Sequence, residues 1–440
     1  MTGQLALALY SLLMRLVQPL LQRKLRRRGA AEPGYLEATG ERLGYYSQPP
    51  ARGALWIHAV SMGETRAAAA LIARLRQALP GTPLLLTHGT ATGRAEGAGL
   101  LQPGDTQVWQ AWDSPAAVQR FLAHFSPRAG LLMETEVWPN LTHACAQRGI
   151  PLLLVNARMN ASSAARATRL RWLSRPAYAA LTAVYAQSPL DADRLQALGA
   201  SVAGVFGNLK FDAQPDLAQR MQGRQAGTGS PRPVVLLASS RAGEESLFLE
   251  SILALANIKS AGNAINSEVS GGFAWPVQWL VVPRHPQRFD EVAALIGARG
   301  LSVSRRSQWG ADAPGVADVW LGDTMGEMSY YYGLAQVALL GGSFAPLGGQ
   351  NLIEALACGC PVVMGPHTFN FAEAAQGAQA AGAAWQTENM ASGLQKALQL
   401  AGNTAELAAA STQGERFIAA HAGAVDKTCA ALLPWLQRRA

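Results

Sequence analysis

Apolar, strand-like runs alternate with alanine-rich helical stretches along most of the chain, and this alternation restricts the fold more than any other feature. The first half contains the runs ALWIHAV, PLLLTHGT, GLLMETEV and PLLLVNAR, and the second contains PVVLLAS, QWLVVPR, VWLGD, QVALLGG and CPVVMG. Strands that alternate with helices form βαβ units and a parallel sheet. The sequence therefore predicts an α/β protein with two Rossmann-like domains facing a cleft.

The chain length supports two domains, because 440 residues exceed the size at which a single hydrophobic core stops growing. The alternation breaks down over residues 213–232, which are rich in Gln, Gly, Pro and Ser, and we predict the interdomain linker there. An N-terminal segment (1–30) then precedes a first domain (31–212), and the second domain covers 233–440. Residues 257–273 are small and polar and are expected to form a surface loop.

Composition excludes several classes of protein. Hydrophobic residues make up 49% and charged residues 15% of the chain, which is too apolar for a disordered protein. The formal charge of +8 indicates an anionic partner. The cysteines have neither C-x-x-C spacing nor partners at metal-binding spacing, so we expect a reducing compartment and no metal site. They are Cys145, Cys358, Cys360 and Cys429.

The N-terminus has the pattern of a membrane anchor. An apolar stretch from Leu5 to Leu21, interrupted by Arg15 and Gln18, is followed directly by QRKLRRR. Because the basic cluster follows the apolar run, the order is the reverse of that in a secretory signal peptide. The basic residues are expected to hold this end at an anionic cytoplasmic membrane surface. An amphipathic helix packed on the protein body is the alternative, and the length does not decide between spanning and interfacial attachment.

The sequence argues against three other functions of basic α/β proteins: ATP hydrolysis, NAD-dependent oxidation and nucleic-acid binding. Neither a Walker A sequence nor G-x-G-x-x-G follows a predicted strand, which argues against an ATPase and an NAD-dependent dehydrogenase. Nucleic acid is the weakest explanation of the positive charge. Six of the 37 basic residues fall within Arg15–Arg28, and no interleaving of aromatic and basic residues follows.

Candidate functional residues of the first half lie after apolar runs, where doubly wound sheets bind ligands. Glu64 follows WIHAV at the start of a helix, where it is either a base or a complement to the positive helix terminus. Glu134 and Glu136 lie on opposite sides of a strand end, so we expect one to be functional. A helix-start carboxylate before Pro139 is the alternative. Lys210 in GNLKFD is placed either to reach an acidic substrate or simply to face solvent.

Candidate nucleotide-binding residues lie in the second half. Arg284 in VVPRHP is suited to paired hydrogen bonds with phosphate. Gly326 in GDTMGEM lets backbone amides approach a ligand. In the glycine-rich segment from Gly341 to Glu354, Asn351 is expected to cap a helix and leave amides for an anion, with Glu354 meeting the ribose. This pattern is typical of nucleotide-sugar transferases.

The order of the motifs resembles one family over almost the whole chain. The segments AVSMGE, METEVWPN, NARM, GNLKFD, VPRHPQRF, GDTMGEM, GGSFAPLGGQN and MGPHTFNF are similar to those of the 3-deoxy-D-manno-oct-2-ulosonic acid (Kdo) transferases of lipopolysaccharide biosynthesis. The resemblance implies a GT-B fold and transfer of Kdo from CMP-Kdo to a lipid A precursor, lipid IVA, at the cytoplasmic face of the inner membrane. It implies no metal or other cofactor. Gln350 replaces a usual histidine, and SSRAGEE replaces the usual S-T-H-x-G-E-E.

The resemblance also assigns roles. Glu64 matches the proton acceptor, and Glu134 and Lys210 match residues that stabilise the transition state. The first domain binds the acceptor and the second binds the donor. The residues that match CMP-contacting segments are Pro283, Arg284, Met325, Gly326, Glu327, Asn351, Leu352, Ile353 and Glu354. Two alternatives stay open: a GT-B relative that uses a UDP-sugar, as a transferase or epimerase, and a non-catalytic, membrane-associated sugar-nucleotide-binding protein.

Overall fold

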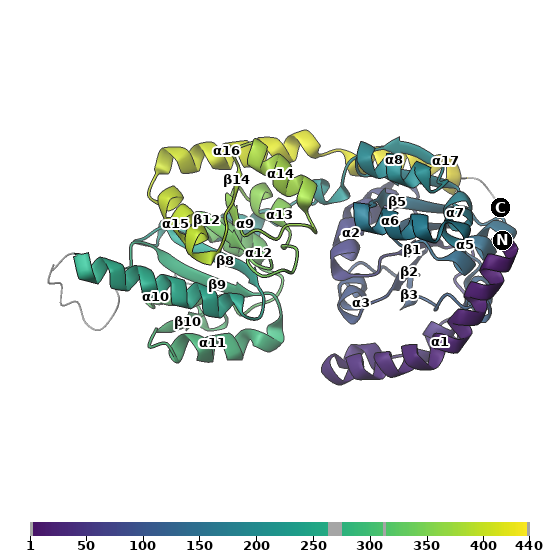
Figure 1. Ribbon diagram of the computed structural model, residues 1–440, viewed down its shortest axis with the longest axis horizontal. Helices are drawn as coiled ribbons and strands as arrows, with labels where there is room; N and C mark the ends of the chain where they lie inside the picture. The colour runs from purple at the N-terminus through teal and green to yellow at the C-terminus, as the bar shows by residue number, and fades with distance from the viewer. Residues whose placement is uncertain (1–2, 263–274, 311–313, 438–440) are drawn as a thin grey trace. The chain divides into compact units, whose positions relative to one another are not determined.

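The computed structural model describes residues 3–262, 275–310 and 314–437, which form two compact units (Figure 1). Unit 1 contains the chain up to Ala213 together with the part from His421 onward, and unit 2 contains Gln214–Ala420. In the described residues each unit is built on a seven-stranded sheet whose neighbouring strands are parallel. The two predicted Rossmann-like domains are therefore confirmed.

The sheet of unit 1 has the strand order β3-β2-β1-β4-β5-β6-β7. Its strands are β1 (Leu55–His58), β2 (Leu84–His88), β3 (Thr106–Trp109), β4 (Ala129–Met133), β5 (Leu152–Ala157), β6 (Ala183–Ala186) and β7 (Val202–Val205). Its helices are α1 (Gly3–Ala31), α2 (Met62–Ala78), α3 (Ala91–Ala98), α4 (Pro115–Phe125), α5 (Pro139–Gln147), α6 (Ala161–Arg169), α7 (Arg171–Ala179), α8 (Pro189–Ala197) and α17 (Ala424–Leu436). Short 3-10 helices cover Pro33–Leu36, Thr39–Leu43 and Leu209–Asp212 (η3).

Both faces of this sheet are buried, which explains the unbroken apolar runs in the sequence. Leu55 and Ile57 of β1 belong to the core on one face, whereas Trp56 belongs to the core on the other face. The Trp56 ring lies 5.0 Å from the Phe121 ring of α4, centroid to centroid, in an edge-on contact. Alternate side chains of one strand thus hold helices on opposite faces.

The C-terminal helix α17 belongs to unit 1, so the predicted second domain, 233–440, is wrong at its C-terminal end. Ala424, Leu432 and Leu436 are buried in the core of unit 1 that also contains the apolar face of α2. The Asp212 carboxylate accepts a hydrogen bond from Val425 N at 2.9 Å. The physical reason is burial, because the apolar face of α17 completes the core of unit 1. The prediction divided the chain into continuous stretches, whereas unit 1 is made of two separate stretches.

The sheet of unit 2 has the strand order β10-β11-β9-β8-β12-β13-β14. Its strands are β8 (Val234–Ser240), β9 (Gln278–Pro283), β10 (Val303–Arg305), β11 (Val319–Leu321), β12 (Val337–Leu340), β13 (Val362–Met364) and β14 (Ala384–Gln386). Its helices are α9 (Leu217–Thr228), α10 (Glu244–Gly262), α11 (Phe289–Gly297), α12 (Met328–Leu334), α13 (Leu352–Ala357), α14 (Ala372–Ala380), α15 (Met390–Ala401) and α16 (Thr404–His421). The 3-10 helices cover Pro286–Arg288 and Arg306–Gln308.

The predicted linker, 213–232, forms a helix in most of its length. Helix α9 packs against α12 so closely that a Cβ atom on Gly223 would lie 2.1 Å from the carbonyl oxygen of Tyr330. Asp216 N donates a hydrogen bond to Ser329 Oγ at 3.1 Å at the start of α9. Two of the glycines in the predicted linker instead permit close contact between helices α9 and α12.

The predicted surface loop at 257–273 also differs from the structure in part. Helix α10 continues to Gly262, so the first residues of that segment are helical. The rest of the predicted loop lies outside the residues that the structure describes.

The strand order of each sheet determines where a ligand is expected to bind. In unit 1, β1 and β4 are neighbours, and in unit 2, β8 and β12 are neighbours, although other strands separate each pair along the chain. These are the points at which the strand order reverses. Doubly wound sheets bind ligands at the carboxyl ends of such strands. Glu64, Glu134 and Asn351 follow β1, β4 and β12 of these pairs, whereas Lys210, Arg284 and Gly326 follow β7, β9 and β11.

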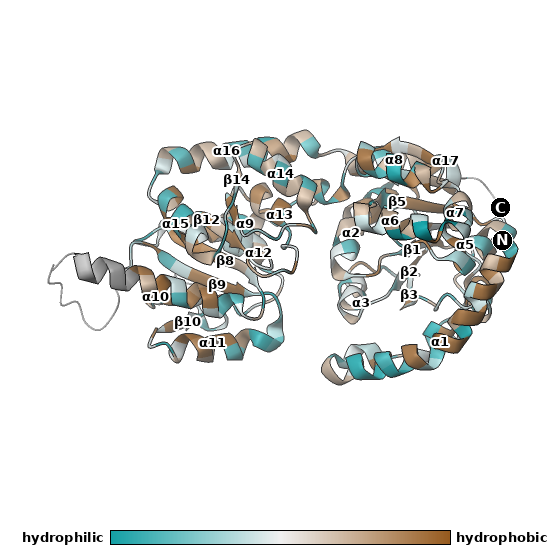
Figure 2. Ribbon diagram, in the orientation of Figure 1, coloured by the Kyte–Doolittle hydropathy of each residue, from teal (hydrophilic) through white to brown (hydrophobic). Residues whose placement is uncertain are grey.

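Helix α1 carries a stripe of exposed leucines on one face. Leu5, Leu9, Leu12, Leu13, Leu16 and Leu20 are each about half-exposed or more. Figure 2 shows the hydrophobic colour along the first part of α1 and the hydrophilic colour toward its other end. The helix is long and apolar enough to cross a membrane, and only 11% of its most apolar 18-residue stretch is buried.

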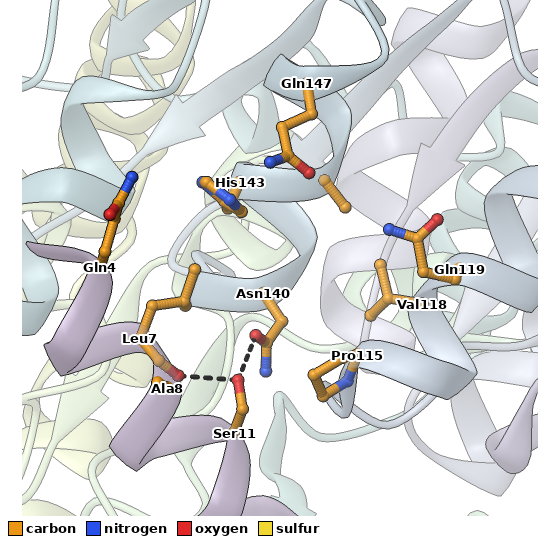
Figure 3. A pocket seen from close by; sticks show the side chains of 11 residues that line it. Gln4, Leu7, Ala8, Ser11, Pro115, Val118, Gln119, Asn140, His143 and Gln147 are labelled. Carbon is orange, nitrogen blue, oxygen red and sulfur yellow. Dashed lines mark hydrogen bonds between the residues drawn. The ribbon is translucent and has the colours of Figure 1, made fainter.

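The opposite face of α1 contacts the body of unit 1. Ser11 Oγ lies 2.7 Å from Asn140 Oδ1 of α5, and the Tyr10 hydroxyl is hydrogen-bonded to Asp113. Beside this contact, a cavity of about 360 Å³ is lined by residues of α1, α4 and α5 (Figure 3). Its lining includes Asn140 and His143, so polar groups face α1 on this side. The body of the protein therefore contacts one face of α1 and leaves the leucine stripe uncovered.

Candidate functional site

The three predicted catalytic residues come together at the β1–β4 switch point of unit 1. Glu64 lies in the first turn of α2, Glu134 directly follows β4, and Lys210 lies in η3. Lys210 Nζ donates to Glu134 Oε1 at 2.7 Å. The charges of Glu134 and Lys210 both act on the Glu64 carboxyl group. Residues that are distant in sequence thus form one charged cluster, which we call the Glu64 cluster.

Glu64 is held at one oxygen. Its Oε2 accepts a hydrogen bond from Val60 N at 2.6 Å, and its Oε1 lies 3.4 Å from Ser61 Oγ. Ser61 caps α2 and accepts from Glu64 N. Burial, together with the negative charges of Glu134 and Glu136, raises the pKa of Glu64 to about 7. Glu64 therefore lies where a carboxylate complements a helix terminus, and its raised pKa makes it chemically able to exchange a proton near neutral pH.

Glu134 has a strained backbone at the end of β4. Its φ of +58° lies in the left-handed region, which non-glycine residues rarely adopt. Glu134 N donates to Val155 O at 3.0 Å, and its carbonyl oxygen accepts from Arg158 N at 3.1 Å. The side chain is 6% exposed, and its Oε2 lies 3.7 Å from the Arg158 guanidinium. Hydrogen bonds to β5 and the following loop thus hold this conformation.

Glu136 differs from Glu134 in its partners. It is half-buried, and burial raises its pKa, while a hydrogen bond with Trp138 lowers it. Its negative charge raises the pKa of Glu64. Of the two carboxylates at this strand end, Glu134 is the one that forms an ion pair with Lys210.

The predicted CMP-contacting residues of unit 2 lie at or after the ends of β9, β11 and β12, and Pro283 is the last residue of β9. The charges of Arg284 and Glu354 both act on the buried hydroxyl of Tyr332, so each of these two residues lies within electrostatic reach of it. Arg284 N donates to Ser240 O at 3.0 Å, which fixes the backbone after β9 to the end of β8. Gly326 has a φ of +80° and precedes α12. The strand ends therefore collect these groups on one edge of the sheet.

Burial and existing hydrogen bonds limit which groups of the predicted CMP-contacting residues are able to reach a nucleotide. The Leu352 and Ile353 side chains are fully buried, at 0% and 1% exposure, so only their backbone is able to face a nucleotide. Asn351 Oδ1 accepts from Ile353 N at 3.1 Å, as predicted for a helix cap. The Ile353 amide is therefore not one of the backbone amides left for an anion. The Glu327 carboxylate is paired with Arg306 at 2.8 Å, and the side chain of Met325 is half-exposed.

The glycine-rich segment closes into a tight loop after β12. A Cβ atom on Gly341 would lie 2.3 Å from Ser239 O, and one on Gly348, whose φ is +89°, would lie 2.4 Å from Asn370 Nδ2. Gln350 N donates to Gly341 O at 3.1 Å. Gln350 thus closes the loop through its backbone, which any non-proline residue supplies.

Glu244 is a central residue of this loop that the sequence reasoning missed. It is fully buried at the start of α10 and accepts four backbone hydrogen bonds. The donors are Gly342 N (2.7 Å), Arg241 N (2.9 Å), Phe344 N (3.1 Å) and Ala345 N (3.2 Å). The signal that could have identified Glu244 is its place in SSRAGEE, at the end of the switch-point strand β8. The residue type alone does not distinguish it from an ordinary carboxylate at the start of a helix.

The cysteines and other metal-ligating residues form no obvious metal centre in the part of the chain that the structure describes. No group of three or more His, Cys, Asp or Glu side chains there is arranged to hold a metal ion. The cysteines are free and buried. Burial raises the pKa of Cys145 and of Cys358 to about 12, so both are protonated thiols at neutral pH.

Comparisons with known proteins identify the family to which the chain is similar. A model of the family described as 3-deoxy-D-manno-octulosonic-acid transferase (kdotransferase) matches residues 37–213. The chain is 46% identical over 437 residues to a 3-deoxy-D-manno-octulosonic acid transferase of Bordetella pertussis, covering 97% of this chain and 99% of the relative. It is 30% identical over 438 residues to the Haemophilus influenzae protein of the same name, with 98% of each chain covered.

A solved structure supports the fold. The structure of a glycosyltransferase from Rickettsia africae has a TM-score of 0.55 and 12% identity, and the match covers 90% of this chain and 100% of that one. At this identity the likeness concerns the fold alone, and it agrees with a GT-B arrangement of two α/β domains. With relatives of 46% and 30% identity that match nearly end to end, the chain belongs to the 3-deoxy-D-manno-octulosonic acid transferase family.

Proposed function

We propose that this protein transfers Kdo from CMP-Kdo to a lipid A precursor, lipid IVA, with Glu64 as the general base. Membership of the family over 97% of the chain supports the reaction. The observation that carries the mechanism is the Glu64 cluster, in which a carboxyl group with a pKa of about 7 lies beside a carboxylate–ammonium pair. A general base works best when its pKa is near the operating pH.

The geometry of Glu64 supports a specific proton acceptor. Val60 N holds Oε2 at 2.6 Å, whereas the contact of Oε1 with Ser61 Oγ is long, at 3.4 Å. Oε1 is therefore the oxygen that takes the proton from the acceptor hydroxyl. The hydroxyl oxygen forms a bond to the anomeric carbon of Kdo as the bond to the CMP phosphate breaks, and CMP leaves with the electron pair. Attack opposite the phosphate inverts the anomeric carbon. The Glu134–Lys210 pair stabilises the charge that develops.

The donor is assigned to unit 2. Arg284 is suited to the phosphate of CMP because a guanidinium forms paired, charge-assisted hydrogen bonds. The backbone near Gly326 and Asn351 supplies further donors, and Glu354 is suited to a ribose hydroxyl. Such fixed donors stabilise a departing phosphate without a bound metal.

The membrane role is assigned to α1. Its leucine stripe is exposed on one face, while Ser11 and Tyr10 contact the protein body on another. A helix with these two faces is suited to lie in the membrane interface. The basic residues of QRKLRRR then meet anionic lipid at the cytoplasmic face of the inner membrane, each contributing about 1 kcal/mol.

The direct test incubates the full-length protein with CMP-Kdo and lipid IVA and measures the lipid product by mass spectrometry. We expect the lipid to gain Kdo, and the mass shows how many units are added. Thermal stabilisation by CMP and by UDP is compared in parallel. Binding of CMP without transfer would show a non-catalytic binding protein, and stabilisation by UDP alone would identify a UDP-sugar enzyme.

The pH dependence of transfer follows from the raised pKa of Glu64. The base form is populated above about pH 7, so kcat/KM is expected to fall about tenfold per pH unit below that value. The decline in kcat/KM below the pKa is the acid limb of the pH–rate profile. The Glu136→Gln substitution removes a negative charge that raises the pKa of Glu64, so the acid limb should move to lower pH. Initial rates from pH 5 to 9 test both statements. A limb near the ordinary pKa of a glutamate would contradict the role of Glu64.

Membrane attachment is expected to depend on the leucine stripe. Replacing Leu9, Leu13, Leu16 and Leu20 with glutamine removes side chains that contribute about 1.5–3 kcal/mol each when fully buried, so vesicle binding should fall more than tenfold. Co-flotation with vesicles containing anionic lipid measures the loss. As a matched control, replacement of exposed Leu217 of α9 by glutamine should leave binding unchanged. Equal flotation of the stripe variant would assign attachment to another surface.

A further inference from the structure

Asn156, near the end of β5, is a buried residue to which the chemistry above assigns no role. It is 2% exposed and has a left-handed φ of +53°. Its Oδ1 accepts a hydrogen bond from Leu209 N at 3.0 Å, while its Nδ2 is buried without a hydrogen-bond partner among the residues that the structure describes. A left-handed non-glycine conformation and an unpaired buried donor both cost free energy. Such costs concentrate at functional sites.

Val155, directly before Asn156, and Arg158, two residues after it, hold the backbone of Glu134. Val155 O accepts from Glu134 N at 3.0 Å, and Arg158 N donates to Glu134 O at 3.1 Å. The end of β5 therefore clamps the strained backbone of Glu134 on both sides. Gln187 Nε2 in turn donates to Asn156 O at 2.9 Å, which ties the same strand end to the residue after β6.

The Asn156 side chain reaches the other partner of the ion pair. Leu209, whose amide it binds, directly precedes Lys210, and the Leu209 side chain is fixed in the core of unit 1. Lys210 N donates to Asn208 Oδ1 at 3.0 Å, which completes the turn. From this turn Lys210 Nζ reaches Glu134 Oε1 at 2.7 Å. One strand end thus holds both members of the pair.

We propose that Asn156 is a positioning residue that holds Lys210 on Glu134 and thereby sets the charge that Glu64 meets. The inference rests on the proposed function, in which Glu64 is the base. When the Asn156–Leu209 bond is absent, the turn that carries Lys210 loses its attachment to β5. The Glu134 carboxylate is then less well neutralised.

The consequence is a change in the acid limb of the rate profile. The charged groups that face Glu64 are Glu134, Glu136 and Lys210, and Arg158 faces Glu134 from the other side. The two carboxylates raise the pKa of Glu64, and Lys210 lowers it. Displacement of Lys210 removes the lowering contribution and strengthens that of Glu134, so the pKa of Glu64 rises and the limb moves to higher pH.

The Asn156→Gly variant separates this role from folding. Glycine adopts the left-handed backbone without strain and removes the unpaired donor, and these gains offset the loss of the acceptor of Leu209 N, so the fold should be retained. In the full-length protein, with CMP-Kdo and lipid IVA, we expect the acid limb of kcat/KM to move up by about one pH unit. The KM for CMP-Kdo should stay within about twofold, because the CMP residues lie in unit 2. Should the glycine variant fail to fold, Asn156→Ser is measured with the same expectation.

Two comparisons decide whether Asn156 acts through Lys210. The Lys210→Met variant should itself shift the limb upward, and adding Asn156→Gly to it should shift the limb no further. The matched control is Ser126→Gly, which relaxes another left-handed residue of unit 1 (φ +40°) at the exposed end of α4 and should leave the limb in place.

Each outcome bears on the inference. A glycine variant that is slower at every pH with an unmoved limb would show a structural role alone and overturn it. A further shift in the Lys210→Met background would also overturn it, because Asn156 would then act by another route. If the unmodified protein transfers no Kdo, the proposed function itself fails, and this result is visible before any variant is compared.

Discussion

Replacement of Glu64 by glutamine is expected to lower kcat for Kdo transfer about 10²–10⁴-fold, the usual contribution of a general base. Glutamine keeps the size of the side chain and an oxygen that is able to accept from Val60 N, which lies 2.6 Å from Oε2. It does not accept a proton at neutral pH. Initial rates with CMP-Kdo and lipid IVA measure the loss, and the acid limb near pH 7 should disappear with it.

The loss should be confined to the chemical step. CMP affinity, measured by calorimetry, is expected to stay unchanged because the candidate CMP residues belong to unit 2. Glu96→Gln is the matched control: Glu96 lies on α3 and pairs with Arg66 at 3.0 Å in a partly exposed contact, so its rate should be close to that of the unmodified protein. Near-normal turnover of Glu64→Gln would remove Glu64 from the mechanism.

Replacement of Glu244 by alanine should produce the largest loss of stability. Four backbone N–H groups lose their acceptor in a site that is fully buried. An unsatisfied buried donor costs about 1–3 kcal/mol, and partial access of water reduces the sum, so we expect a loss of about 3–5 kcal/mol in the unfolding free energy of unit 2. CMP should also bind more weakly, because the loop from Gly342 to Ala345 is released.

Urea unfolding with and without CMP measures both effects. Glu250→Ala serves as the control on the same helix, since Glu250 is exposed and paired with Arg299 at 2.9 Å. A surface pair of this kind contributes about 0–1 kcal/mol. A Glu244→Ala variant as stable as Glu250→Ala would show that water replaces the carboxylate without loss.

Local pattern was enough to predict the architecture and much of the candidate site. The alternation of strands and helices depends on side-chain period, which is local, and it predicted both parallel sheets. Because parallel strands end at one edge of a sheet, residues after these strands were expected to collect there. Glu64, Glu134 and Lys210 do meet at that edge, although 146 positions separate Glu64 from Lys210 (210 − 64).

Contacts between distant segments had no local signal. Glycines that favour a linker in isolation instead let α9 pack against α12, and α17 returns to the core of unit 1 because its apolar face is buried there. The Leu352 and Ile353 side chains, which lie in a motif that resembles a nucleotide site, are buried in the core.

The sequence by itself determined the fold class, the family and the chemical types of the residues at the strand ends. Only the tertiary structure decided their electrostatics. The pKa of Glu64 depends on burial and on charges that arrive from β4 and η3. The roles of Glu244 and Asn156 depend on backbone amides from other loops. Burial and through-space charge depend on the distances between segments, and these distances exist only once the chain has folded.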